Sequence, residues 1–313
     1  MIELTSRNLF CKTSYVIDQI VAKTQKVQPV LITGYWRSGT TWVQNVLAAG
    51  IGAKTLFEPL EPNTLLPLYN GRIKEVAPYV PLSFDVLSKD DLRFLDLAFA
   101  GISPKYQQFN YLSRVNLQEA FRHNVVVKLV RGQYISGDLK ERYNLSNVLH
   151  VSRHPMAVTY SMLRTDWEWS IHEADFAQLY AKEHDMPLPD DKQAILDTLL
   201  RFNNQPPECK IAATWALAEK YTEEQSHTRV FRYEDLVTHP ERQFQAMAQQ
   251  IGHALTLPNN ISAASVVTAK DRTHIDTESR LHSWRDKLDS QKQSNIRSVL
   301  RELWPDIEQH WEL

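Results

Sequence analysis

Short apolar runs alternate along this chain with longer stretches in which apolar residues recur at helical spacing. Runs of this length, rich in valine, leucine and isoleucine, are typical of strands buried on both faces of a parallel sheet. Strands that alternate with helices predict an α/β fold, with a parallel sheet flanked by helices on both faces. The expected strands cover residues 29–33, 54–57, 124–130, 147–152 and 228–232.

The intervening segments carry the helical patterns. Helices are expected over 1–28, 41–49, 89–100, 116–122, most of 172–225 and 290–303, with another starting near Pro155. No repeat, low-complexity stretch or linker interrupts this order, so we expect residues 1–313 to form a single domain. Ligands of such sheets bind beyond the carboxyl ends of the strands. That rule places a set of polar residues along one rim: Arg37, Glu58, Lys128 or Arg131, Arg153 and Tyr233.

Composition narrows the class of protein without naming it. Of the 313 residues, 43% are hydrophobic and 23% charged, as in ordinary globular proteins. A net charge of −2 provides no basic field for nucleic acid or an anionic membrane, so an anionic ligand needs a local site. Two cysteines, Cys11 and Cys209, form no disulfide framework and predict a reducing, cytoplasmic setting. No apolar run is long enough for a signal peptide or a membrane span.

The local anion site is expected directly after the first strand, at Gly34-Tyr-Trp-Arg-Ser-Gly-Thr-Thr41. The glycines have the spacing of a Walker A loop, but Thr40 stands where nucleotide-hydrolysing enzymes carry lysine. A glycine loop between a strand and a helix directs backbone N–H groups and the helix dipole at one point. The alternative is an ordinary strand-to-helix turn. Side chains that bind anions favour the phosphate site: Arg37, Ser38, Thr40 and Thr41.

A second anion signal follows the fourth strand. Arg153 lies at the carboxyl end of that strand, and Ser161 lies about two turns into the helix that begins near Pro155. Taken alone, this motif is a weak signal, because a salt-bridged surface arginine followed by a helix serine would give the same pattern. Together with the loop at 34–41 it provides two separate phosphate grips, which suits a ligand that carries phosphate at two places.

These two motifs resemble the sulfotransferase superfamily, which uses 3′-phosphoadenosine-5′-phosphosulfate (PAPS) as donor. Residues 35–42 resemble the family's loop for the 5′-phosphosulfate, and residues 153–161 resemble its 3′-phosphate motif. Residues 231–236, with Pro240 after them, and residues 283–288 resemble supporting segments of the family. The resemblance implies a PAPS donor, adenosine 3′,5′-bisphosphate as product, and no metal.

Two departures indicate which branch of the superfamily the chain resembles. Cytosolic phenol-type members carry lysine in the loop and a Lys-x-His whose histidine is the base, whereas this chain has Arg37 and Lys128-Leu-Val130. Carbohydrate-modifying and tyrosine-modifying members use a loop arginine and a glutamate base, and Leu56-Phe-Glu-Pro59 resembles their glutamate segment. We therefore expect Glu58 to be the general base, with Glu61 as competing candidate and a surface charge before a proline as the alternative.

The resemblance implies in-line transfer of a sulfuryl group to a hydroxyl, with a carbohydrate or glycolipid as the expected acceptor. Arg37 would act on the departing phosphate as well as binding the donor. Trp42 is expected either to stack on adenine or to be a core residue. Tyr233 is expected to hydrogen-bond adenine, and Lys128 to be an ion-pair partner at its strand end. The implied donor site comprises Arg37, Ser38, Gly39, Thr40, Thr41, Trp42, Arg153, Ser161, Tyr233 and, with Lys270 as its alternative, Arg272.

Two other functions stay open at this point. A nucleotide kinase of the P-loop class would bind ATP with magnesium, and the missing loop lysine counts against it. A non-catalytic protein that retains the nucleotide fold would bind the bisphosphate and transfer nothing. The identity of the acceptor depends on residues 60–122 and 165–225, where the aromatic and acidic residues at 164–169 fit a sugar pocket or a packed helix end.

Overall fold

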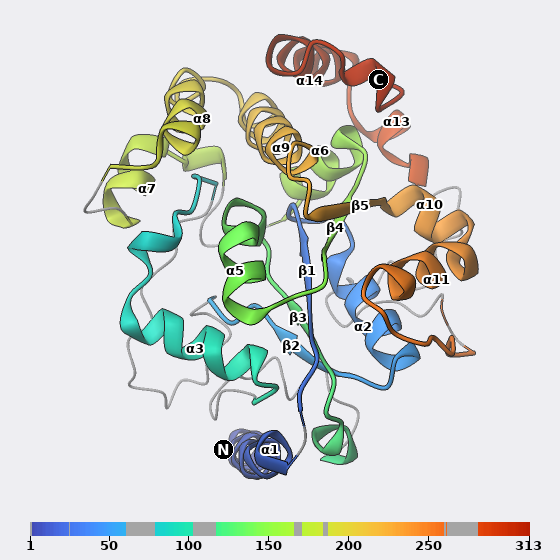
Figure 1. Cartoon of the computed structure of the whole chain (residues 1–313). Helices are drawn as coiled ribbons and strands as arrows, with labels where there is room; N and C mark the ends of the chain where they lie inside the picture. Colours follow the sequence, from blue (N-terminus) through green and yellow to red (C-terminus); the bar gives the residue numbers. More distant parts are fainter. Residues whose placement is uncertain are drawn as a thin grey trace.

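A five-stranded parallel sheet forms the centre of the chain (Figure 1). The computed structural model describes residues 2–24, 26–60, 79–102, 117–165, 171–183, 187–259, 261 and 281–313. The strands lie in the order β2-β3-β1-β4-β5. Their bounds are β1 Pro29–Gly34, β2 Lys54–Phe57, β3 Val125–Lys128, β4 Val148–Ser152 and β5 Thr228–Arg232. All five expected strands are present, and β3 is shorter than the apolar run that predicted it.

The register aligns the carboxyl ends of the strands, where ligand binding is expected. Lys128, the last residue of β3, lies level with both Phe57 of β2 and Ile32 of β1. Gly34 at the end of β1 is paired with Val151 of β4, and Ser152 is paired with Arg232 of β5. Because all the strands are parallel, their carboxyl ends meet at one edge of the sheet.

Alternate side chains of each strand enter two separate hydrophobic clusters, one on each face. On one face, residues such as Leu31 and Val127 pack with α3 (Lys89–Phe99), α5 (Ser136–Tyr143), α6 (Pro155–Leu163), α9 (Pro207–Glu223) and α14 (Ser290–Leu303). On the other, Ile32 and Val126 pack with α2 (Thr40–Gly50), α10 (Tyr233–Thr238) and α11 (Pro240–Gln250). The expected α/β fold with helices on both faces is confirmed.

The remaining described helices surround this core (Figure 1). They are α1 (Ile2–Thr24), α7 (Phe176–Glu183), α8 (Asp190–Leu200) and α13 (Trp284–Lys287), with 3-10 turns at 84–86, 117–121, 132–135, 171–173 and 307–309. Four of the described helices were not expected from the sequence: α5, α10, α11 and α13. α5 buries only Ser136 and Leu139, so its apolar spacing is weak. α11 does bury Phe244, Met247 and Ala248 at helical spacing after an N-terminal proline, which is a signal the sequence carried.

Helix α1 is tied to the amino end of β2 by a buried ion pair. Lys54 Nζ lies 2.9 Å from Asp18 Oδ1, and both side chains are completely buried. The same ammonium group donates to the carbonyl of Ala120. No described helix combines the length and the apolar character needed to cross a bilayer.

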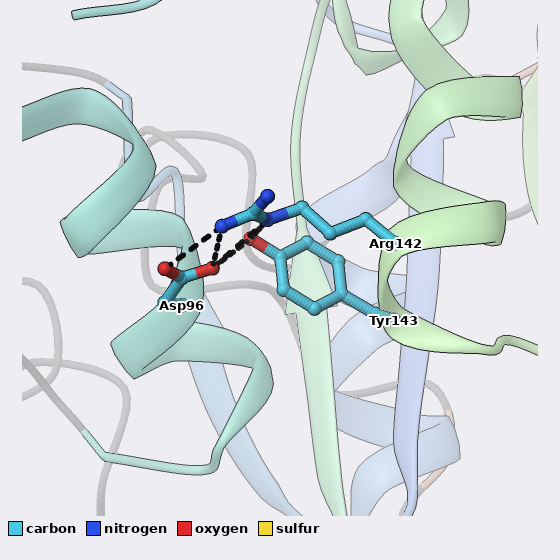
Figure 2. A network of polar contacts seen from close by, with 3 residues as sticks. All are labelled: Asp96, Arg142 and Tyr143. Carbon is cyan, nitrogen blue, oxygen red and sulfur yellow. Dashed lines mark hydrogen bonds and ion pairs between the residues drawn. The ribbon is translucent and has the colours of Figure 1, made fainter. Parts of the chain in front are cut away.

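An exposed polar network joins α3 to α5 at the surface (Figure 2). Arg142 donates to both carboxylate oxygens of Asp96, at 2.8 and 3.0 Å from Nη2. The hydroxyl of Tyr143 donates to Asp96 Oδ1 at 2.8 Å, while its ring stacks on Phe99 with centroids 4.0 Å apart. The two helices are thereby held together outside the hydrophobic core.

Candidate active site

The polar residues expected along one rim do lie at the same edge of the sheet. Glu58, Arg153 and Tyr233 each directly follow a strand, namely β2, β4 and β5. Arg37 lies in the loop between β1 and α2, and Lys128 is the last residue of β3. The sheet order therefore brings the two phosphate motifs onto neighbouring strands, since β1 pairs with β4.

The loop after β1 is closely packed and requires both of its glycines. Gly39 has a φ of 87°, and a Cβ there would lie 2.5 Å from the ring of Tyr233. A Cβ on Gly34 would lie 2.5 Å from Thr40 Cγ2 and 2.7 Å from the carbonyl oxygen of Val151. Left-handed backbone favours glycine at position 39, and the close approach of the chain to β4 requires glycine at position 34. The turn thus sets the first amides of α2 directly at the rim.

The loop fits a bound anion. Helix α2 begins without a side-chain cap, which leaves its first N–H groups for a ligand. Ser38 is completely buried, and its Oγ has no hydrogen-bond partner among the described residues. Buried hydroxyls are normally satisfied, so an orphan beside a helix N-terminus is consistent with an absent ligand oxygen. Thr40 and Thr41 are buried in the first turn of the helix.

The two phosphate motifs touch. Arg37, in left-handed conformation with φ 64°, donates from Nε to Ser161 Oγ at 2.9 Å. Arg153 donates from Nη1 to the carbonyl oxygen of Arg37, also at 2.9 Å. The loop and the β4–α6 motif therefore form one continuous surface. The direct bond between Arg37 and Ser161 was not foreseen from the sequence, which assigned them to different phosphates.

Two aromatic residues lie behind this surface. The guanidinium carbon of Arg153 lies 4.5 Å from the ring centroid of Tyr233, which itself covers Gly39. Trp42 is 8% exposed, donates from Nε1 to the carbonyl of Ile261 and meets the ring of Tyr233 edge-on. Trp42 thus belongs to a hydrophobic core cluster, as one of the two alternatives expected. Contacts of either ring with adenine stay predictions.

Hydrogen bonds to Lys128 and Val130 hold Glu58 at the end of β3. Its Oε1 accepts from Lys128 Nζ at 2.6 Å, and its Oε2 accepts from the N–H of Val130 at 2.9 Å. Its own N–H donates to the carbonyl of Lys128 at 2.9 Å. Lys128 Nζ also lies 3.8 Å from the ring centroid of Phe57. The expectation that Lys128 is an ion-pair partner at its strand end is confirmed.

The environment of Glu58 suits a general base. Burial raises the pKa of its carboxyl above the ordinary value, while the charge of Lys128 and the hydrogen bonds from Lys128 and Val130 lower it in part. A carboxylate with a raised pKa beside a candidate phosphate site is a candidate proton acceptor. Lys128 and Val130 stand in the first and third places of the Lys-x-His pattern, so this carboxylate meets the strand where phenol-type members carry their histidine.

A buried polar network packs beside the start of the loop. It was not predicted from the sequence. Thr33 Oγ1 lies 2.9 Å from His150 Nδ1, whose Nε2 lies 3.1 Å from Glu219 of α9. Nearer the start of α9, Thr214 Oγ1 lies 2.5 Å from the hydroxyl of Tyr35. The sequence did carry a signal for this network, because Thr33 and His150 are polar residues within otherwise apolar strands. Several expected residues lie outside the described part of the chain: Glu61, Lys270, Arg272 and the aromatic residues of 166–170.

Comparison with known proteins identifies the family. The sulfotransferase domain family matches residues 28–306. This chain belongs to the sulfotransferase family. The superfamily resemblance is thus confirmed, and sulfuryl transfer is the reaction class that goes with it. The carbohydrate-type subdivision stays a prediction.

Three solved sulfotransferase structures are similar to this sulfotransferase at low sequence identity. The domain from the curacin biosynthetic pathway is 14% identical, with 92% of this chain and 100% of that chain covered and a TM-score of 0.41. The domain from the Synechococcus PCC 7002 olefin synthase is 13% identical, with 93% and 98% covered and a TM-score of 0.41. The Alicyclobacillus acidocaldarius enzyme is 12% identical, with 93% and 98% covered and a TM-score of 0.39. No curated protein matches the sequence significantly.

Proposed function

We propose that this sulfotransferase moves a sulfuryl group from PAPS to a hydroxyl of a carbohydrate or glycolipid, by in-line displacement with Glu58 as general base. The observation that carries the proposal is the buried carboxylate of Glu58 at the same rim as the candidate phosphate loop, with a raised pKa and two donors, Lys128 at the end of β3 and Val130 just beyond it. The cytoplasmic setting is proposed from the cysteine content alone, including the buried free thiol of Cys209.

The donor would be held by groups from three segments. Loop amides with Ser38, Thr40 and Thr41 would bind the 5′-phosphosulfate, and Arg153 with Ser161 the 3′-phosphate. Arg37 lies between them, because its side chain reaches Ser161 while its carbonyl accepts from Arg153. Gly39 allows the loop to pack on Tyr233. Arg272 is proposed as a further 3′-phosphate contact, and Trp42 and Tyr233 as neighbours of adenine.

The donor supplies a sulfuryl group that leaves its phosphate oxygen for the acceptor oxygen. The protein's part is to position the reactants and to neutralise charge, as in phosphoryl transfer. Arg37 and the amides at the start of α2 provide fixed positive charge where the leaving phosphate gains negative charge. Glu58 accepts the proton that the acceptor hydroxyl loses. None of these roles requires a metal ion.

Titration calorimetry with adenosine 3′,5′-bisphosphate tests the donor site. We expect tight binding that does not depend on magnesium. Arg153→Ala is expected to weaken it by about tenfold or more, since a hydrogen bond from a charged group contributes about 1.5–3 kcal/mol. Arg164→Ala is the matched control, because Arg164 follows the same helix and contacts the Tyr160 hydroxyl. Tighter binding of ATP with magnesium would instead indicate a P-loop kinase.

Transfer of labelled sulfate from PAPS to sugars, glycolipids and phenols tests the chemistry. Glu58→Gln keeps the shape of the side chain and removes its basicity, so kcat is expected to fall by about 10²–10⁴-fold. Preferential transfer to phenols would overturn the acceptor class. Tight bisphosphate binding without transfer to any acceptor, or to water, would identify a non-catalytic binding protein.

A further inference from the structure

We propose that Lys128 is the positioning residue of the general base: it orients the Glu58 carboxylate, keeps it ionised, and acts on the reaction only through it. The inference rests on the proposed role of Glu58. It starts from the position of the pair, since Phe57 and Lys128 lie level at the ends of neighbouring strands and Glu58 is the next residue. The pair therefore stands at the rim and outside the apolar interior of the sheet.

Backbone geometry turns Glu58 toward β3. Its φ of 40° lies in the left-handed region, which is unfavourable for a glutamate. That conformation directs the chain so that the Glu58 N–H meets the carbonyl of Lys128 while the carboxylate meets the lysine's ammonium group. Unfavourable backbone of this kind persists where surrounding contacts over-determine it, and it clusters at functional sites.

Two donors, one at the end of β3 and one just beyond it, set the orientation of the carboxylate. Lys128 binds one oxygen at 2.6 Å, and the N–H of Val130 binds the other at 2.9 Å. The backbone donor cannot change its position, so the lysine decides whether the carboxylate stays in that plane. A carboxylate has about four acceptor sites, so this anchoring is compatible with accepting a proton.

Charge balance explains why the lysine acts through Glu58. The side chain of Lys128 is 4% exposed, and a charge buried to that degree needs a counter-charge. Within the described part of the chain, Glu58 is the ion-pair partner at hand. The ammonium group favours the ionised carboxylate, which is the form that can take a proton.

The reaction balances with this pair in place. The acceptor O–H bond breaks and its proton passes to Glu58. A bond forms from the acceptor oxygen to sulfur, and the bond from sulfur to the phosphate oxygen breaks, with its electron pair remaining on the phosphate. A protonated Glu58 leaves Lys128 without its counter-charge, which favours return of the proton to water after the products leave.

A double-mutant cycle on kcat tests the inference. Lys128→Met is expected to lower kcat at pH 7 about tenfold or more, and to move the acid limb of the pH profile to higher pH because the carboxylate loses its neighbouring charge. In the Glu58→Gln background the same substitution is expected to cause no further loss. Losses that multiply would show that Lys128 acts directly on donor or acceptor, and would overturn the proposal.

A second readout separates this inference from the proposed function. The carboxyl carbon of Glu58, labelled with ¹³C and assigned by its absence in Glu58→Gln, reports the pKa of the group without turnover. We expect Lys128→Met to raise that pKa. If it does so in a protein that transfers no sulfate, the pair stands and the proposed function fails. An unchanged pKa would overturn the positioning role even where kcat falls.

The chain offers a matched control for the loss of a buried lysine. Lys54 is fully buried, pairs with Asp18 at 2.9 Å, and lies at the opposite end of β2. Lys54→Met is expected to lower stability and to leave the acid limb of the pH profile unchanged. If Lys128→Met does not fold, Lys128→Arg takes its place in the cycle, because it retains the charge. It is expected to lower kcat through altered orientation while the acid limb stays in place, and a normal kcat would count against positioning.

Discussion

At the scale of single residues, backbone strain is concentrated at the rim of the sheet. Five described non-glycine residues have positive φ, and three of them are Arg37, Glu58 and Arg131. These three follow β1, β2 and β3, which are neighbours in the sheet. Left-handed backbone costs a residue with a side chain about 1–2 kcal/mol. The loops that carry the proposed catalytic groups therefore hold less favourable conformations than the strands that support them.

Gly39 provides a test of the loop geometry. Gly39→Ala is expected to lower the free energy of unfolding by more than the ~1–2 kcal/mol of left-handed strain, because its Cβ would also meet the ring of Tyr233 at 2.5 Å. Bisphosphate affinity should fall as the loop shifts. Gly52→Ala is the matched control, with a φ of 65° and no atom within 4 Å of the added Cβ. Equal losses of stability in the two variants, measured by urea unfolding, would contradict the packing described here.

The protonation state of Glu58 sets the direction in which kcat/KM is expected to change with pH. Burial raises its pKa above the ordinary 4.5, and a base acts only when ionised. We therefore expect kcat/KM to rise with pH through a midpoint above 4.5 and to fall on acidification. A steady-state pH profile checks this. Persistence of the same limb in Glu58→Gln would assign it to another group.

At the scale of elements, the C-terminal segment supports the turn that carries Arg153. His154 accepts from the N–H of Met156 through Nδ1, so its Nε2 carries the proton and donates to the carbonyl of Glu312 at 2.6 Å. The imidazole also stacks on Trp284 with centroids 4.7 Å apart. A histidine that accepts at one nitrogen and donates at the other must be neutral. The neutral form of His154 therefore makes the hydrogen bonds that hold the β4–α6 turn.

This histidine makes stability depend on pH. Burial lowers the pKa of His154 from 6.5 to about 4, so the unfolded chain binds more protons than the folded one between these values. Its contribution is present above pH 6.5 and is lost as pH falls through about 4. Between pH 7 and pH 5 the loss should be about 2 kcal/mol of unfolding free energy. Urea unfolding of the wild type and of His154→Gln at both pH values measures this loss. An equal change in unfolding free energy between the two pH values in both proteins would contradict the prediction.

At the scale of the whole molecule, two ion pairs join distant elements with very different burial. Asp18 and Lys54 are fully buried between α1 and β2. Asp96 and Arg142 join α3 to α5 with side chains 49% and 39% exposed (Figure 2). A broken buried pair leaves one charge uncompensated, whereas an exposed pair returns to water.

We expect Asp18→Asn to cost about 3–5 kcal/mol of stability. Arg142→Met is expected to cost less than ~1 kcal/mol, although it removes more hydrogen bonds. Both residues are remote from the carboxyl rim, so bisphosphate affinity should remain unchanged in each folded variant. Chemical unfolding together with calorimetry checks both parts, and a larger loss from the Arg142 substitution would reverse this order.

The sequence by itself determined the features that depend on neighbouring residues. Continuous apolar runs specified the five strands, and amphipathic spacing predicted α14 over 290–303. The glycine loop and the motif at 153–161 indicated the two phosphate grips, because their chemistry lies within a few consecutive residues. Where local spacing was weak, as in α5, the prediction failed.

Only the tertiary structure decided which of these residues meet. Glu58 contacts Lys128 and Val130 across 70 and 72 residues, and Arg37 contacts Ser161 across 124. The order of the strands and the left-handed turns after them bring these groups together. Neither feature can be predicted from the spacing of residues along the sequence. The resemblance of residues 56–59 to the family's glutamate segment predicted that Glu58 is a base, and its place after a strand predicted that it lies near the rim. The packed ends of β2 and β3 made it half of an ion pair, because a carboxylate and an ammonium group buried side by side stabilise one another's charge.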